Sequence, residues 1–412
     1  MTDKKKLLKN FFNKYKNLPE QGSDEWLNIK KYTIGGSEIA CVINKNSFLS
    51  PKNLIYNKLT DYKVDNIAVK WGNIYEPITN KTMELIFNIN IRTTGSIPGV
   101  IDGQRFSPDG LGVLDNNIIL FEYKCPYTKE PTKSIPEYYI PQLLTGLCSI
   151  DIVDKCYFVN TMYRICNLDN FKNNLLFNNK IHNKSKTKNS LYSLGFIFFY
   201  INSDKLLEFN NIKQDWIRET IHESSEEDNM DKNKINQPII DIGKFDKKQL
   251  DILFQLLDNN IIKIKYSPII LINKNFNKLN LIKSHYSNKT NETINMVETK
   301  EMSLNNYILK KKYKYINKFI KKYGDNVFGI MPYKLLNINI LEKQREPNFL
   351  KQNEKHIKKF LYNLNSLKNI KKKNILYNKL EKLYKNDNKY YVNNSNYDNI
   401  KYNNRLNSLL LF

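Results

Sequence analysis

The period of apolar and polar positions changes several times along the first half of the chain. Residues 1–20 are basic and carry apolar residues at helical spacing, whereas residues 118–124 (IILFEYK) form a nearly continuous apolar run. A short run of this kind predicts a buried β-strand. Because residues i and i+2 of a strand share a face, this strand would carry Glu122 and Lys124 on one side.

Start and stop signals predict the other elements of this region. We expect one helix to start just before Trp26, at Ser23 or Asp24, and another at Ser50-Pro51. A further helix is expected from Trp71, with a kink or a start at Pro77. Ser37 follows two glycines, which predicts a helix N-cap at this serine. Strands are predicted at 89–93, 97–100, 104–107, 118–124, 155–162 and 194–201, and helices at 136–150 and 203–222, the last with Ser203 as N-cap.

These elements predict an α/β fold with a central mixed sheet flanked by helices. From residue 304 onward, lysines alternate with Tyr, Ile, Phe and Leu, which predicts two or three basic helices and a largely helical C-terminal region. We divide the chain into a basic lead (1–20), a main domain (21–222) with an insertion loop (167–190), an acidic linker (223–240) and an uncharacterised basic C-terminal domain (241–412).

The formal charge of +24 is carried almost entirely by lysine, with 59 Lys against 6 Arg. Residues 301–412 hold 24 Lys and Arg and 8 Asp and Glu, a net +16. Clustered lysines neutralise phosphates, so this asymmetry indicates a nucleic-acid partner. An AT-rich coding sequence, which also produces many Asn, Ile and Tyr, explains the excess equally well.

Cysteine spacing and hydropathy exclude several classes of protein. The five cysteines include no Cys-x-x-Cys pair, which argues against a zinc or iron–sulfur site. The N-terminus lacks the apolar core of a signal peptide, and no run reaches ~20 apolar residues. We therefore expect an intracellular, soluble protein without a membrane partner.

Acidic residues and a lysine gather around the predicted strand in a pattern that suits phosphodiester hydrolysis. Asp109 lies in a Pro-Asp-Gly turn before it, and the strand itself carries Glu122 and Lys124. Carboxylates and a backbone carbonyl, here that of Tyr123, are oxygen ligands that Mg²⁺ prefers. Lys124 can orient a water or stabilise phosphate charge, and Glu76 on the preceding helix can complete the acidic set. Mn²⁺ is the alternative ion.

Motifs in a fixed order resemble those of the phage lambda exonuclease and YqaJ-type viral recombinase family, within the PD-(D/E)XK nucleases. They cover residues 20–165 and are much more specific together than singly. The family resemblance implies a restriction-endonuclease-like core in residues 21–222. The motifs are Trp26 through Ser37-Glu38, Trp71-Gly72 to Tyr75-Glu76, Ser107-Pro108-Asp109-Gly110, Glu122-Tyr123-Lys124-Cys125-Pro126, and Gln142.

The resemblance also implies a role for each matching residue. Asp109 and Glu122 look like metal ligands, Lys124 like the catalytic lysine, Glu76 like an additional acid and Gln142 like a helix glutamine at the catalytic centre. The remaining matches, Ser37, Ser107 and Lys30, resemble residues that bind the 5′-terminal phosphate of DNA. Lys30 stands where the family has an arginine, so a point charge replaces a bidentate fork.

Each residue also has a plain structural interpretation. Asp109 suits a turn cap, Glu122 and Lys124 suit an ion pair on a strand, and Ser37 suits a helix cap. Glu76, Gln142 and Lys30 are compatible with ordinary solvated helix positions.

The function expected from this resemblance is a Mg²⁺-dependent exodeoxyribonuclease. It would degrade double-stranded DNA from 5′ ends and leave 3′ overhangs for recombination or genome processing. An endonuclease or alkaline nuclease, and a catalytically silent DNA-binding scaffold, stay open as alternatives. The family includes a toroidal trimer, which implies a homo-oligomer, by analogy a trimeric ring. The family also works beside single-strand annealing proteins, which implies a single-strand annealing protein as partner. Composition and family suggest a large DNA virus or mobile element, with the protein in the host cytoplasm or nucleus.

Overall fold

A computed structural model of the chain divides into two compact units, each described separately below. One comprises Met1–Thr161 with Ile338–Phe412, and the other Met162–Asn337. The chain passes between the units within two strands, β7 (Lys155–Ile165) and β13 (Val327–Gln344). The structure describes residues 3–19, 22–46, 48–60, 62, 66–169, 171, 193–209, 240–272, 281–283 and 301–385, with only the backbone at 271–272, 281–283 and 301–308.

The first unit contains a mixed sheet in the order β2-β5-β6-β7. β5 and β6 form an antiparallel hairpin, and β6 pairs in parallel with β7. Asp115 and Asn116 turn this hairpin with φ of 46° and 59°, a left-handed conformation that Asp and Asn tolerate. The strands are β2 (Ile91–Arg92), β5 (Gly110–Leu114) and β6 (Asn117–Lys124), besides β7.

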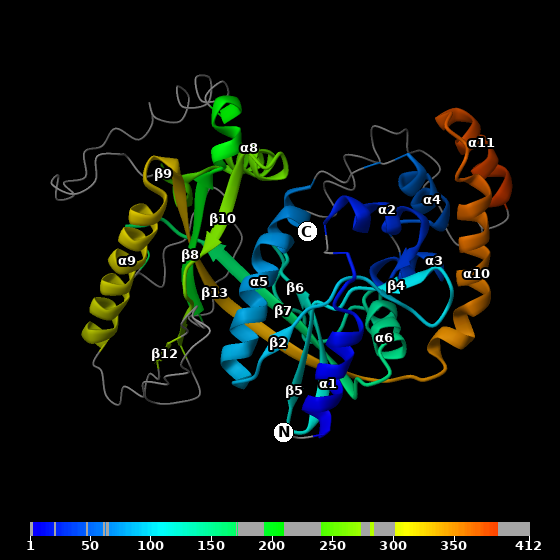
Figure 1. Cartoon of the computed structure of the whole chain (residues 1–412), viewed down its shortest axis with the longest axis horizontal. Coiled ribbons are helices and arrows are strands. Elements are labelled where there is room, and N and C mark those ends of the chain that lie inside the picture. The colour runs from blue at the N-terminus through cyan, green and yellow to red at the C-terminus, as the bar shows by residue number, and fades with distance from the viewer. Residues whose placement is uncertain are drawn as a thin grey trace. The chain divides into compact units, whose positions relative to one another are not determined.

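Helices cover both faces of β6. Met83 of one helix packs with Phe121 on one face, whereas Leu143 of another packs with Leu120 on the opposite face. Figure 1 shows these helices, α5 and α6, on either side of the sheet. The helices of this unit are α1 (Asp3–Lys14), α2 (Asp24–Tyr32), α3 (Ile39–Val42), α4 (Pro51–Leu59), α5 (Ile67–Phe87), α6 (Ile140–Ser149), α10 (Phe349–Leu367) and α11 (Lys373–Leu383).

Two predicted helix starts are confirmed. Ser23 accepts a hydrogen bond from Trp26 N–H and begins α2, and Ser50 accepts one from the Asn53 N–H and begins α4. α5 begins earlier than predicted, at Ile67, because the side chain of Asn66 caps it. It continues through Pro77 to a left-handed residue, Asn88, so the expected start at Pro77 is wrong.

A small second sheet lies in the same unit. β1 (Ile34–Gly35) pairs in parallel with β4 (Gln104–Phe106), which pairs with β3 (Ile97–Pro98). Gly36 follows β1 and packs on Phe106, since a Cβ at residue 36 would lie 2.4 Å from Cδ2 of the phenylalanine ring. This glycine therefore keeps the segments after β1 and β4 in contact.

The helices near the C-terminus complete the core of the first unit. Phe349, Ile357 and Leu364 of α10 and Leu380 of α11 are buried in the same apolar cluster as Leu120. These helices lie beside α3, α4 and α6 in Figure 1. The predicted linker, 223–240, lies outside the described residues except for Ile240, so that boundary stays a prediction. The contacts of residues 338–385 group them with the N-terminal 161 residues.

The second unit is built on a largely antiparallel sheet. β8 (Ser193–Ile201) pairs with β13, β10 (Ile262–Tyr266) and β11 (Ile270–Ile272), and β11 pairs with β12 (Leu281–Lys283). The parallel pair is β13 with β9 (Ile240–Asp241). α9 (Glu301–Tyr323) packs on β8 through stacked Phe319 and Phe198 rings, 4.4 Å apart, and α8 (Lys247–Asp258) belongs to the same unit.

Two predictions for the later chain are wrong in part. Residues 327–344 form β13, so the C-terminal region is not largely helical although α9, α10 and α11 are present. The reason is burial, because residues 328–336 are all buried, as in an inner strand rather than an amphipathic helix. Ser203 is not an N-cap, since Asn202 precedes the 3₁₀ turn Ser203–Lys205. Most of the predicted loop 167–190 lies outside the described residues.

None of the helices in the described part of the chain is long and apolar enough to cross a membrane.

Candidate active site

The C-terminal end of β6 carries an acid and a lysine in contact. Glu122 is only 1% exposed, although a carboxylate is among the groups most costly to bury. The Nζ of Lys124 lies 2.6 Å from Oε1 of Glu122, and both side chains project from one face of the strand. The structure therefore brings together the two residues that the strand pattern singled out.

Gln142 adds an amide to this pair. It lies in the first turn of α6, where Pro141 is tolerated, and its Nε2 donates to Oε1 of Glu122. Leu143 and Leu147, both fully buried, hold α6 against the sheet. Oε1 of Glu122 thus accepts from two side chains that come from different elements.

Asp109 lies directly before β5 and faces the same centre. The register pairs Gly110 with Phe121, so its continuation by one residue places Asp109 opposite Glu122. Oδ2 of Asp109 accepts a hydrogen bond of 2.8 Å from the backbone N–H of Tyr123. The turn at Pro108 therefore delivers this carboxylate to the end of the neighbouring strand.

The site is electrostatically dominated by acids. Burial, followed by the charges of Glu122 and Glu76, raises the pKa of Asp109 well above its usual range. Burial and the charge of Glu122 likewise raise the pKa of Glu76, which reaches the site from α5. Burial opposes the charge on Lys124, but Glu122 and Asp109 outweigh it and raise the lysine's pKa. We call Asp109, Glu122, Lys124, Gln142 and Glu76 the carboxylate cluster.

One oxygen in this cluster indicates what it can hold. Oε2 of Glu122 is buried and has no hydrogen-bond partner in the structure. An orphaned buried carboxylate oxygen is costly unless a cation or donor meets it. It lies beside Asp109, whose carboxylate is also directed to the end of β6.

These donors fit Mg²⁺. Among the described residues, no group of three or more His, Cys, Asp or Glu side chains is arranged to hold a metal ion. The site offers two carboxylates, those of Asp109 and Glu122, which lie opposite each other where β5 begins and β6 ends. The Tyr123 carbonyl as a further oxygen ligand stays a prediction. The pair of carboxylates suits Mg²⁺, which usually keeps several waters and binds substrate phosphates beside one or two protein carboxylates.

The predicted phosphate-binding serines lie on neighbouring segments. β1 pairs Ile34 with Gln104 and Gly35 with Arg105, and Ser37 and Ser107 each follow two residues after this paired stretch. Ser37 is exposed and Ser107 half-buried, and Ser107 is two residues from Asp109. The predicted N-cap at Ser37 is wrong, because this residue lies inside the 3₁₀ turn Gly36–Glu38.

Lys30 is held differently from the serines. It lies in the last turn of α2, and its Nζ sits 4.8 Å from the centre of the Trp26 ring. The structure records no direct contact between Lys30 and Ser37 or Ser107 within its described residues. We call these three the end-recognition residues.

Glu38 and Lys58 connect the elements around the end-recognition residues; Glu38 ends the first family motif, but no sequence pattern predicted that it pairs with Lys58. Nζ of Lys58 lies 2.8 Å from Oε1 of Glu38, and their side chains are only 6% and 14% exposed. Lys58 also donates to the carbonyl of Lys30, and Oε2 of Glu38 accepts from Gly35 N–H. The pair thus joins α4, α2 and β1. The residues lie 20 positions apart and no motif contains both, so nothing in the sequence linked them.

The comparison with protein families covers all of these residues. A model of the YqaJ-like viral recombinase domain matches residues 25–150. This segment is therefore similar to a YqaJ-like viral recombinase domain, and we call it the YqaJ-like domain. The carboxylate cluster and the end-recognition residues all lie inside it.

Proteins similar to this chain include viral proteins. A protein of African swine fever virus, Badajoz strain, is 26% identical over 205 residues, which are 42% of this chain and 59% of the relative. Its counterpart in a South African tick isolate from Pretoriuskop is 27% identical over 198 residues, 41% of this chain and 57% of the relative. The matches thus span less than two thirds of the relatives' own length.

Solved structures similar to this chain include an alkaline exonuclease of Laribacter hongkongensis. The match has 23% identity and a TM-score of 0.28, and covers 34% of this chain and 74% of that enzyme. The same enzyme in complex with dAMP matches with the same values.

Proposed function

We propose that the protein is a Mg²⁺-dependent deoxyribonuclease acting on double-stranded DNA. The observation that carries this proposal is the buried Glu122, whose Oε1 is held by Lys124 and Gln142 while Oε2 has no partner. A purely structural ion pair would not leave a buried carboxylate oxygen unsatisfied beside a second acid. The YqaJ-like domain supports the same class of function.

The chain's own residues have distinct tasks in this proposal. Asp109 and Glu122 would hold the ion, which when bound supplies positive charge at a phosphate and acidifies a water. Lys124 is a cation in this acidic surrounding, so it stabilises negative charge on the phosphate and orients a water. Gln142 keeps the Glu122 carboxylate in one orientation, and Glu76 increases the negative potential of the site.

We further propose a 5′-to-3′ exonuclease that leaves 3′ single strands for recombination or genome processing. Support comes from Ser37 and Ser107, which follow the paired strands β1 and β4 and offer hydroxyls for a terminal phosphate; Ser107 is two residues from Asp109 in the sequence. Lys30 would add positive charge to that phosphate site. A homo-oligomer, with a trimeric ring as the model, and a single-strand annealing partner belong to this proposal as well. A restriction-endonuclease-like core for residues 21–222 is part of it too.

The test compares DNA substrates that differ only in their ends. Linear duplex with a 5′-phosphate, the same duplex with a 5′-hydroxyl, and covalently closed circular duplex are each incubated with the protein and Mg²⁺, and with EDTA as control. We expect loss of the linear phosphorylated DNA from its 5′ ends and an intact circle. Nicking of the circle would favour the endonuclease alternative, and DNA binding without any cleavage would leave only the scaffold alternative.

A further inference from the structure

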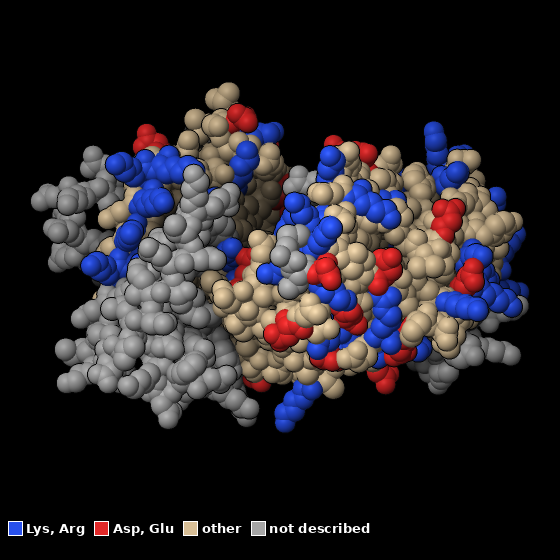
Figure 2. Space-filling model, turned by 60° about the horizontal axis from the view of Figure 1, so that its bottom comes forward, with Lys and Arg blue, Asp and Glu red and all other residues tan. Residues whose placement is uncertain are grey.

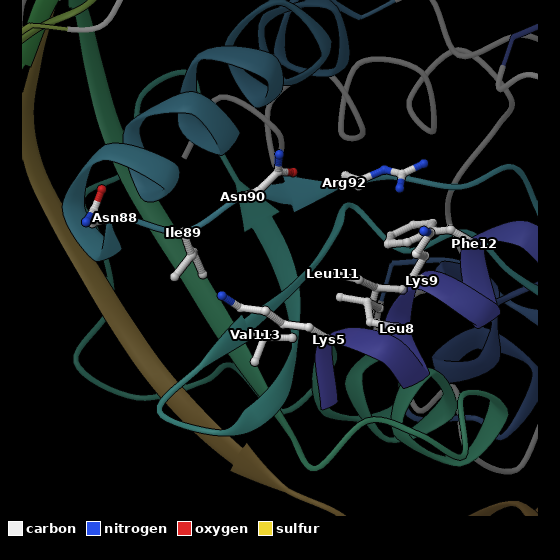
Figure 3. Close-up of a pocket in the computed structure, with 10 residues that line it drawn as sticks. All are labelled: Lys5, Leu8, Lys9, Phe12, Asn88, Ile89, Asn90, Arg92, Leu111 and Val113. Atoms are coloured by element: carbon white, nitrogen blue, oxygen red, sulfur yellow. The ribbon is translucent and has the colours of Figure 1, made fainter. Parts of the chain in front are cut away.

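A groove between α1 and the edge of the sheet in the first unit is lined by cations without a carboxylate. Its volume is about 350 Å³, within the range of ligand sites. Lys5 and Lys9 reach it from α1 and Arg92 from β2, and its floor includes Leu111 and Val113. Figure 3 shows the three basic side chains around these two residues of β5.

The local charge of this groove differs from that of the surface in general. On the face shown in Figure 2, Lys and Arg are interspersed with Asp and Glu. The residues that line the groove include no Asp or Glu. No ion pair is recorded for Lys5, Lys9 or Arg92 among the described residues. Three cations without a recorded carboxylate partner around one cavity give it a positive potential that favours an anionic ligand.

Arg92 is the residue that compositional bias does not explain. The chain contains 59 lysines and only 6 arginines, so an arginine is not the default basic residue here. Arg105, Arg164 and Arg345 each donate to backbone carbonyls. The recorded contact of Arg92 is the face of the Phe12 ring, 4.2 Å from its Cζ, and the residue is solvent-exposed. Its N–H donors are therefore available to a ligand such as phosphate.

The wall that carries the two lysines is well anchored. Leu8, Phe11 and Phe12 of α1 are buried in the core of the unit. Lys4 pairs with Asp154, which also accepts from the backbone N–H of Ile118 at the start of β6. The spacing of Lys5 and Lys9, one helical turn apart, is thus held against the sheet.

The groove and the carboxylate cluster share one face of the sheet. Alternation along β5 puts Leu111 and Val113 on the same side as Asp109, and Leu111 pairs with Leu120, two residues before Glu122. At ~3.3 Å per residue the groove floor begins roughly 7 Å and extends to roughly 13 Å from Asp109. A DNA strand rises ~3.4 Å per nucleotide, so the groove floor lies about two to four nucleotides away from Asp109.

We propose that this groove binds the sugar–phosphate backbone of a DNA strand next to the carboxylate cluster, with Arg92, Lys5 and Lys9 on its phosphates. The choice of DNA rests on the proposed nuclease function. The apolar floor then lies under the sugars, and the three cations follow the strand at its rim.

The test measures how DNA affinity depends on salt for the full-length chain. Duplex DNA with a 3′ single-stranded tail is titrated in Ca²⁺ instead of Mg²⁺ by fluorescence anisotropy at several salt concentrations. Arg92→Ala and the double variant Lys5→Ala, Lys9→Ala remove the cations, and Lys6→Ala is the matched control, being exposed on the same helix but outside the groove. The salt slope is the slope of the logarithm of DNA affinity against the logarithm of salt concentration. We expect its magnitude to fall by about 1 for each groove cation removed.

Equal slopes for the groove variants and Lys6→Ala would overturn the proposal. Arg92→Lys, which keeps the charge, should retain most of the slope and excludes a folding defect as the cause. Competition by free dAMP with an unchanged DNA slope would assign the groove to a free nucleotide and also overturn it. Cleavage of linear duplex in Mg²⁺ is measured on the same preparations. If the groove variants weaken DNA binding but the protein does not cleave DNA, the nuclease proposal is refuted and the groove proposal stands. If the protein cleaves DNA but the groove variants leave the salt slope unchanged, the groove proposal is refuted and the nuclease proposal stands.

Discussion

The carboxylate cluster and the end-recognition residues belong to one YqaJ-like domain but are held in different ways. Lys124 and Gln142 both contact Glu122 directly, and the carboxylate of Asp109 accepts a hydrogen bond from the backbone N–H of Tyr123. By contrast, Lys30 faces Trp26, and the structure records no contact from it to either serine within the described residues. The first group is organised by strand register, whereas the second depends on separate elements.

In the proposed function, this difference separates hydrolysis from end selection. The register of β5 and β6 determines where Asp109 and Glu122 lie, so strand pairing fixes the two carboxylates relative to each other. The positions of Lys30 and Ser37 depend on the buried Glu38–Lys58 pair, which joins α2, α4 and β1. Substitutions in the two groups should therefore change different kinetic quantities, kcat in one and the preference for phosphorylated ends in the other.

Removing a charge from the carboxylate cluster should have the largest effect. Asp109→Asn keeps the shape and the acceptor for Tyr123 N–H but removes the charge that would hold the ion. We expect cleavage to fall by more than about a thousandfold, ~4 kcal/mol in the activation free energy. Single-turnover cleavage of linear duplex in Mg²⁺ measures this.

Asp115→Asn provides the matched control for that variant. Asp115 is exposed in the turn between β5 and β6, and Asn tolerates its left-handed conformation. Its cleavage rate should equal that of the wild type. Wild-type activity in Asp109→Asn would refute the assigned role of this aspartate.

Breaking the Glu38–Lys58 pair should have the next largest effect. Lys58→Met keeps much of the side-chain volume but leaves the nearly buried Glu38 carboxylate without its partner. We expect the free energy of unfolding to fall by about 3 kcal/mol. The preference for a 5′-phosphate over a 5′-hydroxyl end should fall as well, because Lys58 no longer links the backbone at Lys30 to Glu38, the residue next to Ser37.

Chemical denaturation and end-labelled cleavage assays measure the two effects separately. Lys45→Met serves as control, because Lys45 belongs to the same YqaJ-like domain but is exposed. If Lys58→Met loses stability but keeps full discrimination between ends, the pair supports only the fold.

Local patterns in the sequence predicted much of the carboxylate cluster. A strand places Glu122 and Lys124 two residues apart on one face, and this follows from chain geometry alone. Gln142 reached Glu122 although Pro141 precedes it, because proline is tolerated at a helix start. Long-range contacts could not be read this way, as Glu38 and Lys58 show. β13 was missed because a strand buried on both faces has no alternation to mark it.

Asp241 in the second unit tests whether a raised pKa alone marks a catalytic acid. Burial raises its pKa to about 6, although its carboxylate accepts from the backbone N–H groups of Leu168 and Gly243. Because the folded state binds the proton more tightly than an unfolded chain with a pKa near ~3.9, stability should fall as pH rises from about 4 to 6. The change is on the order of 2 kcal/mol and should stop above the folded pKa.

Denaturation of the wild type and Asp241→Asn at pH 4.5 and 7.5 measures this difference. The variant should lack the fall in stability, with cleavage unchanged. A stability difference between the two proteins that is the same at both pH values would contradict the raised pKa of Asp241. Loss of cleavage in Asp241→Asn would show that buried acids outside the carboxylate cluster also matter for hydrolysis.

Lys30→Arg should have the smallest effect and addresses end selection directly. An arginine can donate two parallel hydrogen bonds to a phosphate, whereas lysine offers one point charge. If Lys30 contacts the terminal phosphate, the substitution should raise the preference for 5′-phosphorylated over 5′-hydroxyl ends several-fold, about 1 kcal/mol, without changing kcat on the preferred end. Lys31→Arg, at the next position of α2, is the control and should change neither quantity. If the wild type and Lys30→Arg both cleave 5′-phosphorylated and 5′-hydroxyl ends at equal rates, the role of Lys30 is to stabilise α2 through its contact with Trp26. End selection would then rest on Ser37 and Ser107 or be absent, while hydrolysis by the carboxylate cluster would be unaffected.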